Sequence, residues 1–250
     1  LARPELLGQQ IKMEKSARDL MLAVDISASM KASDMVDQDG NNRQRLHIVK
    51  AVVNNFIADR EGDRIGLIVF GSKAYVQSPF TEDLDTVQQM LAQTQVGMAG
   101  PLTAIGDAIG LSIRSFQSSE VDQRLMILLS DGADTSSMMS PINAAEIAAE
   151  YGVTIHTVGV GDPDAEGNHK VDLPALKDLA GRTGGRLFFA DDEAGLTAIY
   201  SEIEALNPRI TETVSFQPRR PVGWVAFAAG MLAGLLSLLW YWLSSRRRGT

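Results

Sequence analysis

Short apolar runs alternate with longer amphipathic stretches along the first 206 residues of the chain. The short runs, such as "LMLAV" and "RIGLIVF", are apolar throughout, which is typical of strands buried on both faces. Between them, apolar residues recur at helical spacing, as at 43–60, where Leu46, Val49 and Val53 share one predicted helix face. This repetition of strand and helix predicts a doubly wound α/β domain with a mostly parallel sheet.

The same pattern gives bounds for each element. Strands are expected at 19–25, 64–70, 73–78, 124–130, 153–160 and 185–190. Helices are expected at 43–60, 84–93, 103–116, 141–151, 173–184 and 193–206. Gly71 and Ser72 separate the second and third strands by a short turn, which favours a hairpin at this point.

The C-terminal part has a different pattern. Residues 222–243 contain no charge, and as a helix they are long enough to cross a hydrocarbon core of about 30 Å. Trp224 lies near one end and Trp240 near the other, as in an aromatic belt, and arginines follow at 246–248. We therefore expect a lead-in at 1–17, a domain at 18–206, a linker at 207–221, a transmembrane helix at 222–243 and a basic tail at 244–250.

Composition and charge narrow the classes of function. The chain has no cysteine, which excludes disulfides and thiolate metal sites, and its three histidines are scattered, which disfavours a histidine-rich zinc site. The formal net charge is −8, and the negative charge is concentrated before residue 207. An acidic body repels phosphates, so we expect no nucleic-acid partner.

Polar residues follow two of the predicted buried strands. Asp25, Ser27 and Ser29 form D-x-S-x-S after the first strand, and Asp131 follows the strand at 124–130. Alone, the first cluster is also typical of a turn or a helix cap. Hydroxyl and carboxylate oxygens are, however, the hard ligands that Mg²⁺ and Ca²⁺ prefer. If the two strands are neighbours, both carboxylates meet at the sheet edge where such folds bind ligands, and they repel each other unless a cation lies between them.

The order D-x-S-x-S, then Thr at the start of a helix, then Asp, resembles the metal-ion-dependent adhesion site of von Willebrand factor type A (vWA) domains, over 18–206. The resemblance implies a Rossmann-like six-stranded sheet with one antiparallel edge strand. It also implies a bound Mg²⁺, or Ca²⁺ or Mn²⁺, whose shell a Glu or Asp carboxylate of a partner protein completes. The matching residues are the hydroxyls Ser27, Ser29 and Thr103 and the carboxylates Asp25 and Asp131, which in the family often act through water. The family often has glycine where this chain has Ala28.

A narrower resemblance rests on "LARPE", "GDRIGLIVF", "LTAIGDAIG" and the apolar C-terminal run. These segments are similar to those of bacterial Bat-type (aerotolerance) membrane proteins, which are encoded with MoxR-family AAA+ ATPases. The resemblance implies a bacterial inner-membrane protein with a periplasmic domain. It implies a role in envelope protein assembly or stress tolerance, with other Bat-type proteins and a MoxR-type ATPase as partners. In those proteins a membrane segment precedes "LARP", and this chain does not begin with methionine.

The same residues allow other functions. A metal-assisted hydrolase or phosphotransferase would use Asp25, but no general acid–base motif accompanies it, so we expect a binding module and not an enzyme. A scaffold with a vestigial metal site is a third interpretation. Asp34 and Asp134 are further candidates for contacts with a partner.

Four remaining features are interpreted as structural. The acidic stretch 34–42 has the wrong residues for a calcium loop, and "GVGDPDAEG" at 159–167 lacks the third glycine of a dinucleotide site, so both are expected to be surface loops. Asp107 lies one helical turn after Thr103 and is expected to cap or orient. His156 lies in an apolar strand and is expected to be a satisfied core residue.

Overall fold

The structure is a computed structural model. It describes residues 5–7, 11–15, 18–60, 62–131, 134–161, 171–206, 212–216, 219–221 and 223–247. The chain divides into two compact units. The larger unit is Ser16–Glu212, and the smaller one combines Leu1–Lys15 with Thr213–Thr250.

A six-stranded sheet in the order β10–β9–β8–β3–β6–β7 forms the centre of the larger unit. Its strands are β3 (Arg18–Asp25), β6 (Arg64–Phe70), β7 (Ala74–Thr81), β8 (Gln123–Ser130), β9 (Val153–Val160) and β10 (Leu187–Ala190). Neighbouring strands are parallel, except that β7 runs antiparallel to β6. The structure therefore confirms the expected mostly parallel sheet and its antiparallel edge.

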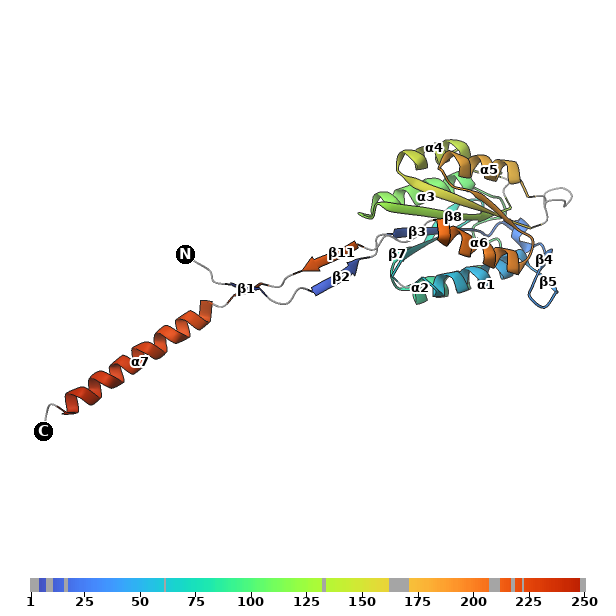
Figure 1. Cartoon of the computed structure of the whole chain (residues 1–250). Helices are drawn as coiled ribbons and strands as arrows, with labels where there is room; N and C mark the ends of the chain where they lie inside the picture. The colour runs from blue at the N-terminus through green and yellow to red at the C-terminus, as the bar shows by residue number, and fades with distance from the viewer. Residues whose placement is uncertain are drawn as a thin grey trace. The chain divides into compact units, whose positions relative to one another are not determined.

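Helices cover both faces of this sheet (Figure 1). One face carries α1 (Arg45–Ala58), α2 (Leu84–Gln93) and α6 (Glu193–Leu206). The other carries α3 (Ile105–Gln117), α4 (Pro141–Glu150) and α5 (Leu173–Arg182). Between β3 and α1 lie the short 3₁₀ helix η1 (Ala28–Lys31) and a hairpin of β4 (Met35–Val36) and β5 (Asn42–Arg43). The bounds of α1 to α6 agree with those of the predicted helices to within a few residues.

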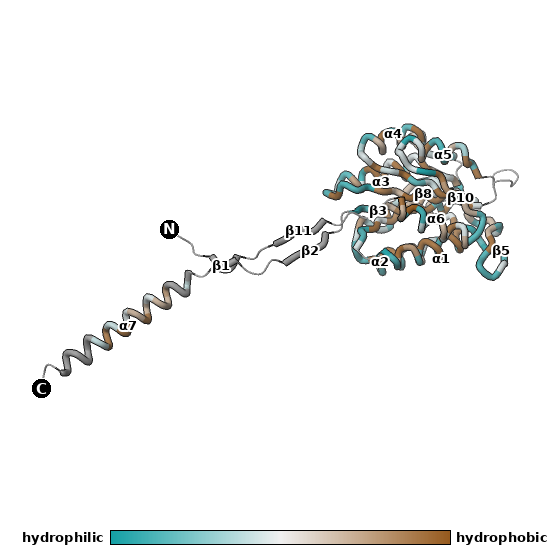
Figure 2. The backbone as a smooth tube through the Cα atoms, viewed as in Figure 1, coloured by the Kyte–Doolittle hydropathy of each residue, from teal (hydrophilic) through white to brown (hydrophobic). Residues whose placement is uncertain are grey.

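Each central strand contributes to two cores. In β3, Leu20, Leu22 and Val24 pack into the core on the α1 side, whereas Met21 and Ala23 pack into the core on the α3 side. Figure 2 shows the resulting hydrophobic centre, with hydrophilic residues on the outer helices and loops. Burial on both faces explains why the strand sequences are apolar throughout and do not alternate.

The order in which the strands are added to the sheet reverses at β3. From β3 it continues to β6 on one side, and later enters β8 on the other. Such a switch point separates the loops that leave neighbouring strands and opens a place for ligands at their carboxyl ends. The expectation that the strand of Asp25 and the strand before Asp131 are neighbours is confirmed.

A cluster of charged residues closes the opposite end of the sheet. Arg18, the first residue of β3, is buried and forms ion pairs with Asp63 and with Glu204, the latter at 3.1 Å. Arg60 also pairs with Glu204, which lies near the end of α6. The start of β3 and the end of α6 are therefore joined at the end of the domain that is remote from Asp25.

The smaller unit contains most of the segments expected to flank the domain. The segments expected to be a lead-in and a linker form paired strands: β1 (Glu5–Leu7) with β12 (Arg219–Pro221), and β2 (Ile11–Lys15) with β11 (Glu212–Phe216). Each of these strands is too short to be predicted from its own sequence. Its pairing is also not visible in the sequence, because the partner strand lies near the other end of the chain. Residues 223–243 of the expected membrane segment lie within α7 (Gly223–Arg247).

Among the residues that the structure describes, no helix combines the length and the apolar character that a membrane crossing requires. The transmembrane assignment of 222–243 is therefore not confirmed.

Candidate metal centre

The loop after β3 brings the three residues of D-x-S-x-S together. Asp25 is the last residue of β3, and its Oδ1 accepts a hydrogen bond from the backbone N–H of Ser27 at 2.8 Å. The hydroxyl oxygens of Ser27 and Ser29 are 2.9 Å apart. No non-glycine residue in the described part of the chain has a positive φ, so Ala28 fits the loop without backbone strain.

Ser130 holds the other oxygen of the Asp25 carboxylate. Its hydroxyl donates to Asp25 Oδ2 at 2.6 Å, and Ser130 is the last residue of β8. The parallel register that pairs Val24 with Leu129 brings the next two residues, Asp25 and Ser130, together. Ser130 was not among the predicted site residues, although it directly precedes Asp131 and the strand register identifies it.

Asp25 and Asp131 are two buried carboxylates at neighbouring strand ends. Asp25 is fully buried, and Asp131 is 3% exposed. Burial chiefly, and then the negative charge of Asp131, raise the pKa of Asp25 to about 7, against the opposing hydrogen bonds from Ser130 and Ser27. A cation between the two carboxylates would remove this repulsion.

Arg45 supplies a permanent positive charge beside the site. It is the first residue of α1 and is completely buried. Its Nη1 donates to Asp131 Oδ2 at 3.4 Å, and its Nε donates to Asp34 Oδ1 at 2.8 Å. Gly161, with φ of 122°, lies against the guanidinium, and a Cβ there would be 2.4 Å from its carbon. Arg45 was not predicted as a site residue, because no local motif distinguishes it from the other residues of an amphipathic helix.

The loop before α3 positions Thr103 through its backbone. Thr103 is 5% exposed, and its carbonyl accepts hydrogen bonds from the N–H groups of Thr135 and Ser136 at 2.9 and 3.1 Å. The N–H of Ala28 donates to the carbonyl of Pro101 at 3.0 Å, which joins this loop to the D-x-S-x-S loop. These bonds hold the backbone of Thr103 and join its loop to the D-x-S-x-S loop, and the Thr103 hydroxyl makes none of them.

The acidic residues around the site hold loops in place. Asp34 is bound by Arg45, and Asp134 Oδ1 accepts from the N–H of Ile105 at 2.9 Å. Asp107 Oδ1 accepts from the N–H of Met138 at 2.9 Å, which is the orienting role expected for it. Contacts of Asp34 and Asp134 with a partner stay a prediction.

The other features interpreted as structural have different outcomes. His156 is buried, and its Nδ1 accepts from the N–H of Arg186 at 3.0 Å, which confirms a satisfied core residue. The stretch 34–42 contains the β4–β5 hairpin, where Asp37 pairs with Arg43 at 2.8 Å. Of 159–167, residues 162–167 lie outside the described residues.

The donor set fits a small, hard cation. Within the described ranges there is no cluster of three or more His, Cys, Asp or Glu side chains that could hold a metal, and the candidate donors include the hydroxyls of Ser27 and Ser29. Adjacent ligands of an octahedral Mg²⁺ at about 2.1 Å lie about 3 Å from each other. The hydroxyl oxygens of Ser27 and Ser29, which share a hydrogen bond, are 2.9 Å apart, and this separation is also compatible with two adjacent ligands.

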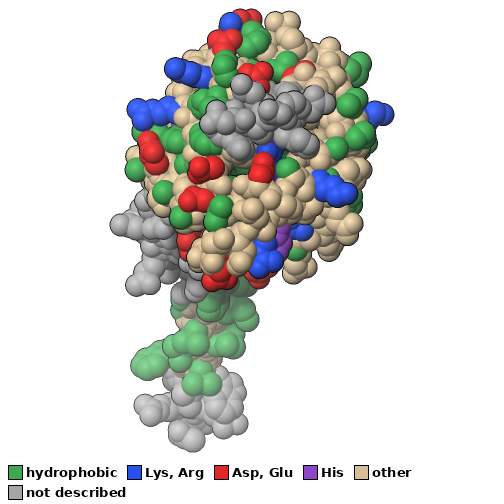
Figure 3. Space-filling view, turned by 90° about the vertical axis from the view of Figure 1, so that its right-hand side faces the viewer, with side chains coloured by type: hydrophobic (Ala, Val, Ile, Leu, Met, Phe, Trp, Pro, Cys, Tyr) green, Lys and Arg blue, Asp and Glu red, His purple; other side chains and the backbone are tan. Residues whose placement is uncertain are grey.

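One face of the larger unit carries side chains of both charges. Figure 3 shows acidic, basic and hydrophobic side chains interspersed over this face of the larger unit.

Comparison with known proteins supports the fold and the family. The model of the von Willebrand factor type A domain matches residues 19–202. An uncharacterized protein of Borreliella burgdorferi is 24% identical over 208 residues, which are 77% of this chain and 60% of that relative. A UPF0353 protein of Nocardia farcinica is 24% identical over 255 residues, or 90% of this chain and 74% of the relative.

Solved structures agree with this assignment. The chain is similar to the conserved hypothetical protein BatB of Bacteroides thetaiotaomicron, with a TM-score of 0.64, 27% identity and coverage of 76% of this chain and 98% of that one. It is also similar to an aerotolerance-related membrane protein of Bacteroides fragilis, with a TM-score of 0.64, 26% identity and coverage of 75% and 99%. Proximal thread matrix protein 1 of the mussel byssus, described with a zinc-occupied MIDAS motif, shares the fold, with a TM-score of 0.61, 18% identity and coverage of 84% and 50%. The chain belongs to the von Willebrand factor type A domain family.

Proposed function

We propose that this chain binds a partner protein through a divalent cation, Mg²⁺ in the first place, held at the rim of its vWA domain. The observation that carries the proposal is the pair of serine hydroxyls 2.9 Å apart beside two buried carboxylates. Ca²⁺ and Mn²⁺ suit the same oxygen donors. The zinc-occupied motif described for the mussel protein supports a divalent metal at this position of the fold.

Each residue of the site has a distinct role in this proposal. The hydroxyls of Ser27, Ser29 and Thr103 would hold the ion directly, and Asp25 and Asp131 would act through water. When bound, the ion supplies a Lewis-acidic position that accepts a carboxylate oxygen from a Glu or Asp of the partner. Neutral hydroxyl ligands leave the charge of the ion largely uncompensated, which favours an anionic ligand atom.

The same geometry makes Asp25 a poor nucleophile. Both of its carboxylate oxygens already accept hydrogen bonds, one from Ser27 and one from Ser130. These bonds orient the carboxylate and reduce its nucleophilicity. We therefore propose a binding function without catalysis.

Metal binding is tested by calorimetric titration of Mg²⁺ and Mn²⁺ into the full chain. Ser29→Ala removes one proposed ligand from a half-buried position and should weaken both affinities at least tenfold. Ser201→Ala, on the exposed side of α6, is the matched control and should bind the metals as the wild type does. Equal affinities of Ser29→Ala and wild type would remove this site from the proposal.

The partner is sought by crosslinking and pulldown from native membranes. Wild-type chain with Mg²⁺ is compared with wild-type chain in EDTA and with Ser29→Ala. We expect partners that are lost in both comparisons. Partners captured equally in all three samples would show that the metal does not mediate recognition.

The cellular setting is also part of the proposal. The Bacteroides fragilis neighbour is described as an aerotolerance-related membrane protein, which supports a role at a bacterial membrane. We propose that the chain acts in the inner membrane with its domain in the periplasm, in envelope protein assembly or stress tolerance. Other Bat-type proteins and a MoxR-type ATPase are the proposed partners there.

Attachment to the membrane through 222–243 has its own test. The full chain should stay in the membrane fraction after alkaline carbonate extraction. A chain that ends at Pro221 should be released. Release of both would show that this segment is not an anchor.

A further inference from the structure

A groove lies between α3, α4 and the start of β7, close to the candidate metal centre. Its volume is about 860 Å³, within the range of about 300–1,000 Å³ that is usual for ligand pockets. The residues that line it include Gly110, Leu111, Met138, Met139, Ile147 and Tyr151. The lining is therefore largely apolar, although the groove is open to solvent.

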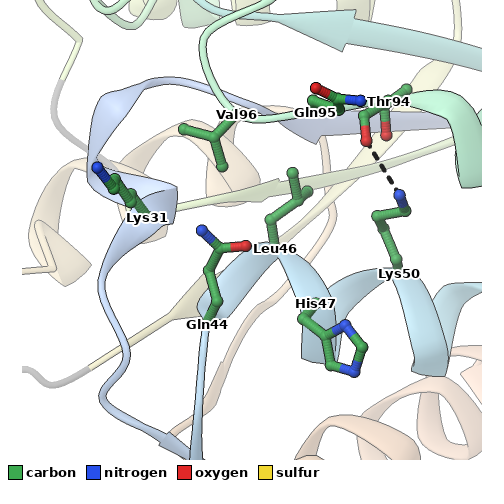
Figure 4. A pocket seen from close by; sticks show the side chains of 8 residues that line it. All are labelled: Lys31, Gln44, Leu46, His47, Lys50, Thr94, Gln95 and Val96. Carbon is green, nitrogen blue, oxygen red and sulfur yellow. Dashed lines mark hydrogen bonds between the residues drawn. The ribbon is translucent and has the colours of Figure 1, made fainter.

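A second hollow, on the α1 side, has a different character. It measures about 460 Å³ and is lined by residues of η1, α1 and the segment 94–96 (Figure 4). Its most enclosed cation, Lys50, donates to the carbonyls of Ala92 and Thr94 at 2.7 and 3.0 Å. Because this ammonium group is already bound, the hollow carries no argument for a ligand.

The first groove is continuous with the loop that carries Thr103. Ser72, which lines the groove, accepts a hydrogen bond at its Oγ from the N–H of Leu102 at 3.0 Å. Ser136, on the same wall, donates its hydroxyl to the carbonyl of Ser72 at 3.4 Å and its N–H to the carbonyl of Thr103 at 3.1 Å. The wall of the groove therefore adjoins the loop that carries Thr103.

The groove is preformed. Gly106 lies so close to the loop after β8 that a Cβ there would be 1.9 Å from the carbonyl oxygen of Met139. Asp107 binds the N–H groups of Met138 and Met139 on the same loop. The backbone of the loop after β8 is thus held against α3, whereas Met138 on this loop is 96% exposed. A flexible, polarizable side chain held in this way adapts readily to an apolar partner.

Gly110 lines the groove, and packing against neighbouring residues does not require a glycine at this position. It lies in the middle of α3, where glycine lowers helix stability relative to alanine. Close packing explains Gly106, but a Cβ on Gly110 would meet nothing within 4 Å. The space that Gly110 leaves open lies inside the groove, so a bound side chain would use it.

We propose that this groove receives the apolar side chains of the partner segment whose carboxylate binds at the metal centre. The inference rests on the proposed function and specifies the partner: an acidic residue followed closely by Leu, Ile, Met or Phe. Lys73 and Arg114 also line the groove, while Asp107 is engaged by backbone N–H groups, so a second acidic residue in the segment is favoured.

The test begins with peptides displayed on phage. The full chain in mild detergent with Mg²⁺ is panned against random twelve-residue peptides, and the enriched peptides are synthesised. We expect an acidic residue followed within a few positions by large apolar residues. Enrichment of peptides without this pattern, or no enrichment at all, would overturn the proposal.

Affinities of the synthetic peptides then locate their binding site. Gly110→Leu fills the groove and should weaken binding at least tenfold. Gly181→Leu in α5 is the matched control, because a Cβ on this helical glycine also meets nothing within 4 Å, and it should change nothing. Met138→Ser, at an exposed position, is a second variant that should weaken binding even if Gly110→Leu does not fold.

The outcomes separate the groove from the metal site. Binding that is lost in EDTA but is unaffected by Gly110→Leu and Met138→Ser would overturn the groove and leave the proposed function standing. Binding that these variants weaken, but that EDTA and Ser29→Ala leave intact, would support the groove and overturn the metal-dependent function. Self-association of the chain that Gly110→Leu abolishes would assign the groove to a second copy, against this proposal.

Discussion

Arg45→Met removes the positive charge beside the buried carboxylates. Methionine is unbranched and still fills much of the space that the arginine side chain occupies. In the wild type the guanidinium contacts Asp131 at 3.4 Å and binds Asp34 through two of its nitrogens. Asp131 has a side chain only 4% exposed, so solvent cannot replace the lost partner, whereas Asp34 is 28% exposed and can be hydrated. Most of the expected effect therefore comes from Asp131.

The structure sets the size of the effect. Removal of one partner from a buried ion pair costs about 3–5 kcal/mol. The long contact and the partial exposure of Asp34 favour the lower end, or about 3 kcal/mol. For a domain of this size, 1 kcal/mol corresponds to about 2–4 °C in the unfolding temperature, so Arg45→Met should unfold about 6–12 °C lower in EDTA.

Mg²⁺ should reverse part of this loss. A ligand at 100 times its dissociation constant stabilises the folded state by about 2.7 kcal/mol. Arg45→Met leaves a more negative site, which should bind the cation more tightly than the wild type does. The rise in unfolding temperature between EDTA and Mg²⁺ should therefore be larger in the variant than in the wild type.

Thermal unfolding followed by circular dichroism measures both effects. Arg43→Met, two residues earlier, is the control: its ion pair with Asp37 involves a half-exposed arginine, and the unfolding temperature should hardly change. If Arg45→Met melts like the wild type in EDTA, or if Mg²⁺ raises its unfolding temperature by no more than it raises that of the wild type, the electrostatic role assigned to Arg45 is wrong.

Three further changes follow from individual contacts. Gly161→Ala should destabilise the domain, because its methyl group would collide with the guanidinium of Arg45 and φ is 122°; chemical denaturation measures the loss. Ser130→Ala removes the bond to Asp25 Oδ2 and should weaken Mn²⁺ binding about 10-fold or more in calorimetry. Burial raises the pKa of Asp19 above its ordinary 3.8, against Ser119, Arg64 and Arg124, so its contribution to stability is present below pH 3.8 and lost as pH rises through the raised value. Asp19→Asn should therefore stabilise the domain at pH 7.5 and not below pH 3.8, as measured by denaturation at both values.

Each change has a control or an opposing outcome. Gly184→Ala also has a positive φ but open space around its Cβ, so it should cost less than Gly161→Ala; equal costs would refute the clash. Ser115→Ala, in α3, should bind Mn²⁺ normally, and a normal affinity of Ser130→Ala would show that its hydroxyl is not needed. A loss of stability of Asp19→Asn at pH 7.5 would contradict the pH argument.

The order of strands and helices was predictable because burial on both sheet faces leaves continuous apolar runs in the sequence. The spacing of Asp25, Ser27 and Ser29 was informative for a similar reason: a loop after a strand turns alternate side chains to one point. What the sequence could not show was strand neighbourhood. Ser130 became part of the site only through the register of β3 and β8.

Contacts between distant segments account for the other gaps. Arg45 and Asp131 are separated by 86 positions, and neither belongs to a pattern that names the other. The contact of Asp34 with Arg45 was likewise not predictable, because only the fold brings the two side chains together. The strands β1 and β12 likewise form a pair that neither segment predicts by itself.

The position of β3 has a mechanical consequence. Its first residue, Arg18, is joined to Glu204 where the last helix of the domain ends, and its last residue, Asp25, lies at the proposed metal centre. Force applied by a partner at Asp25, and resisted at the ion pair of Arg18 with Glu204, would act along the length of β3. This strand is paired in parallel with β6 on one side and β8 on the other along nearly its whole length. Such a load shears both ladders at once instead of unzipping them bond by bond, so the domain should resist force best in the direction in which a bound partner would pull.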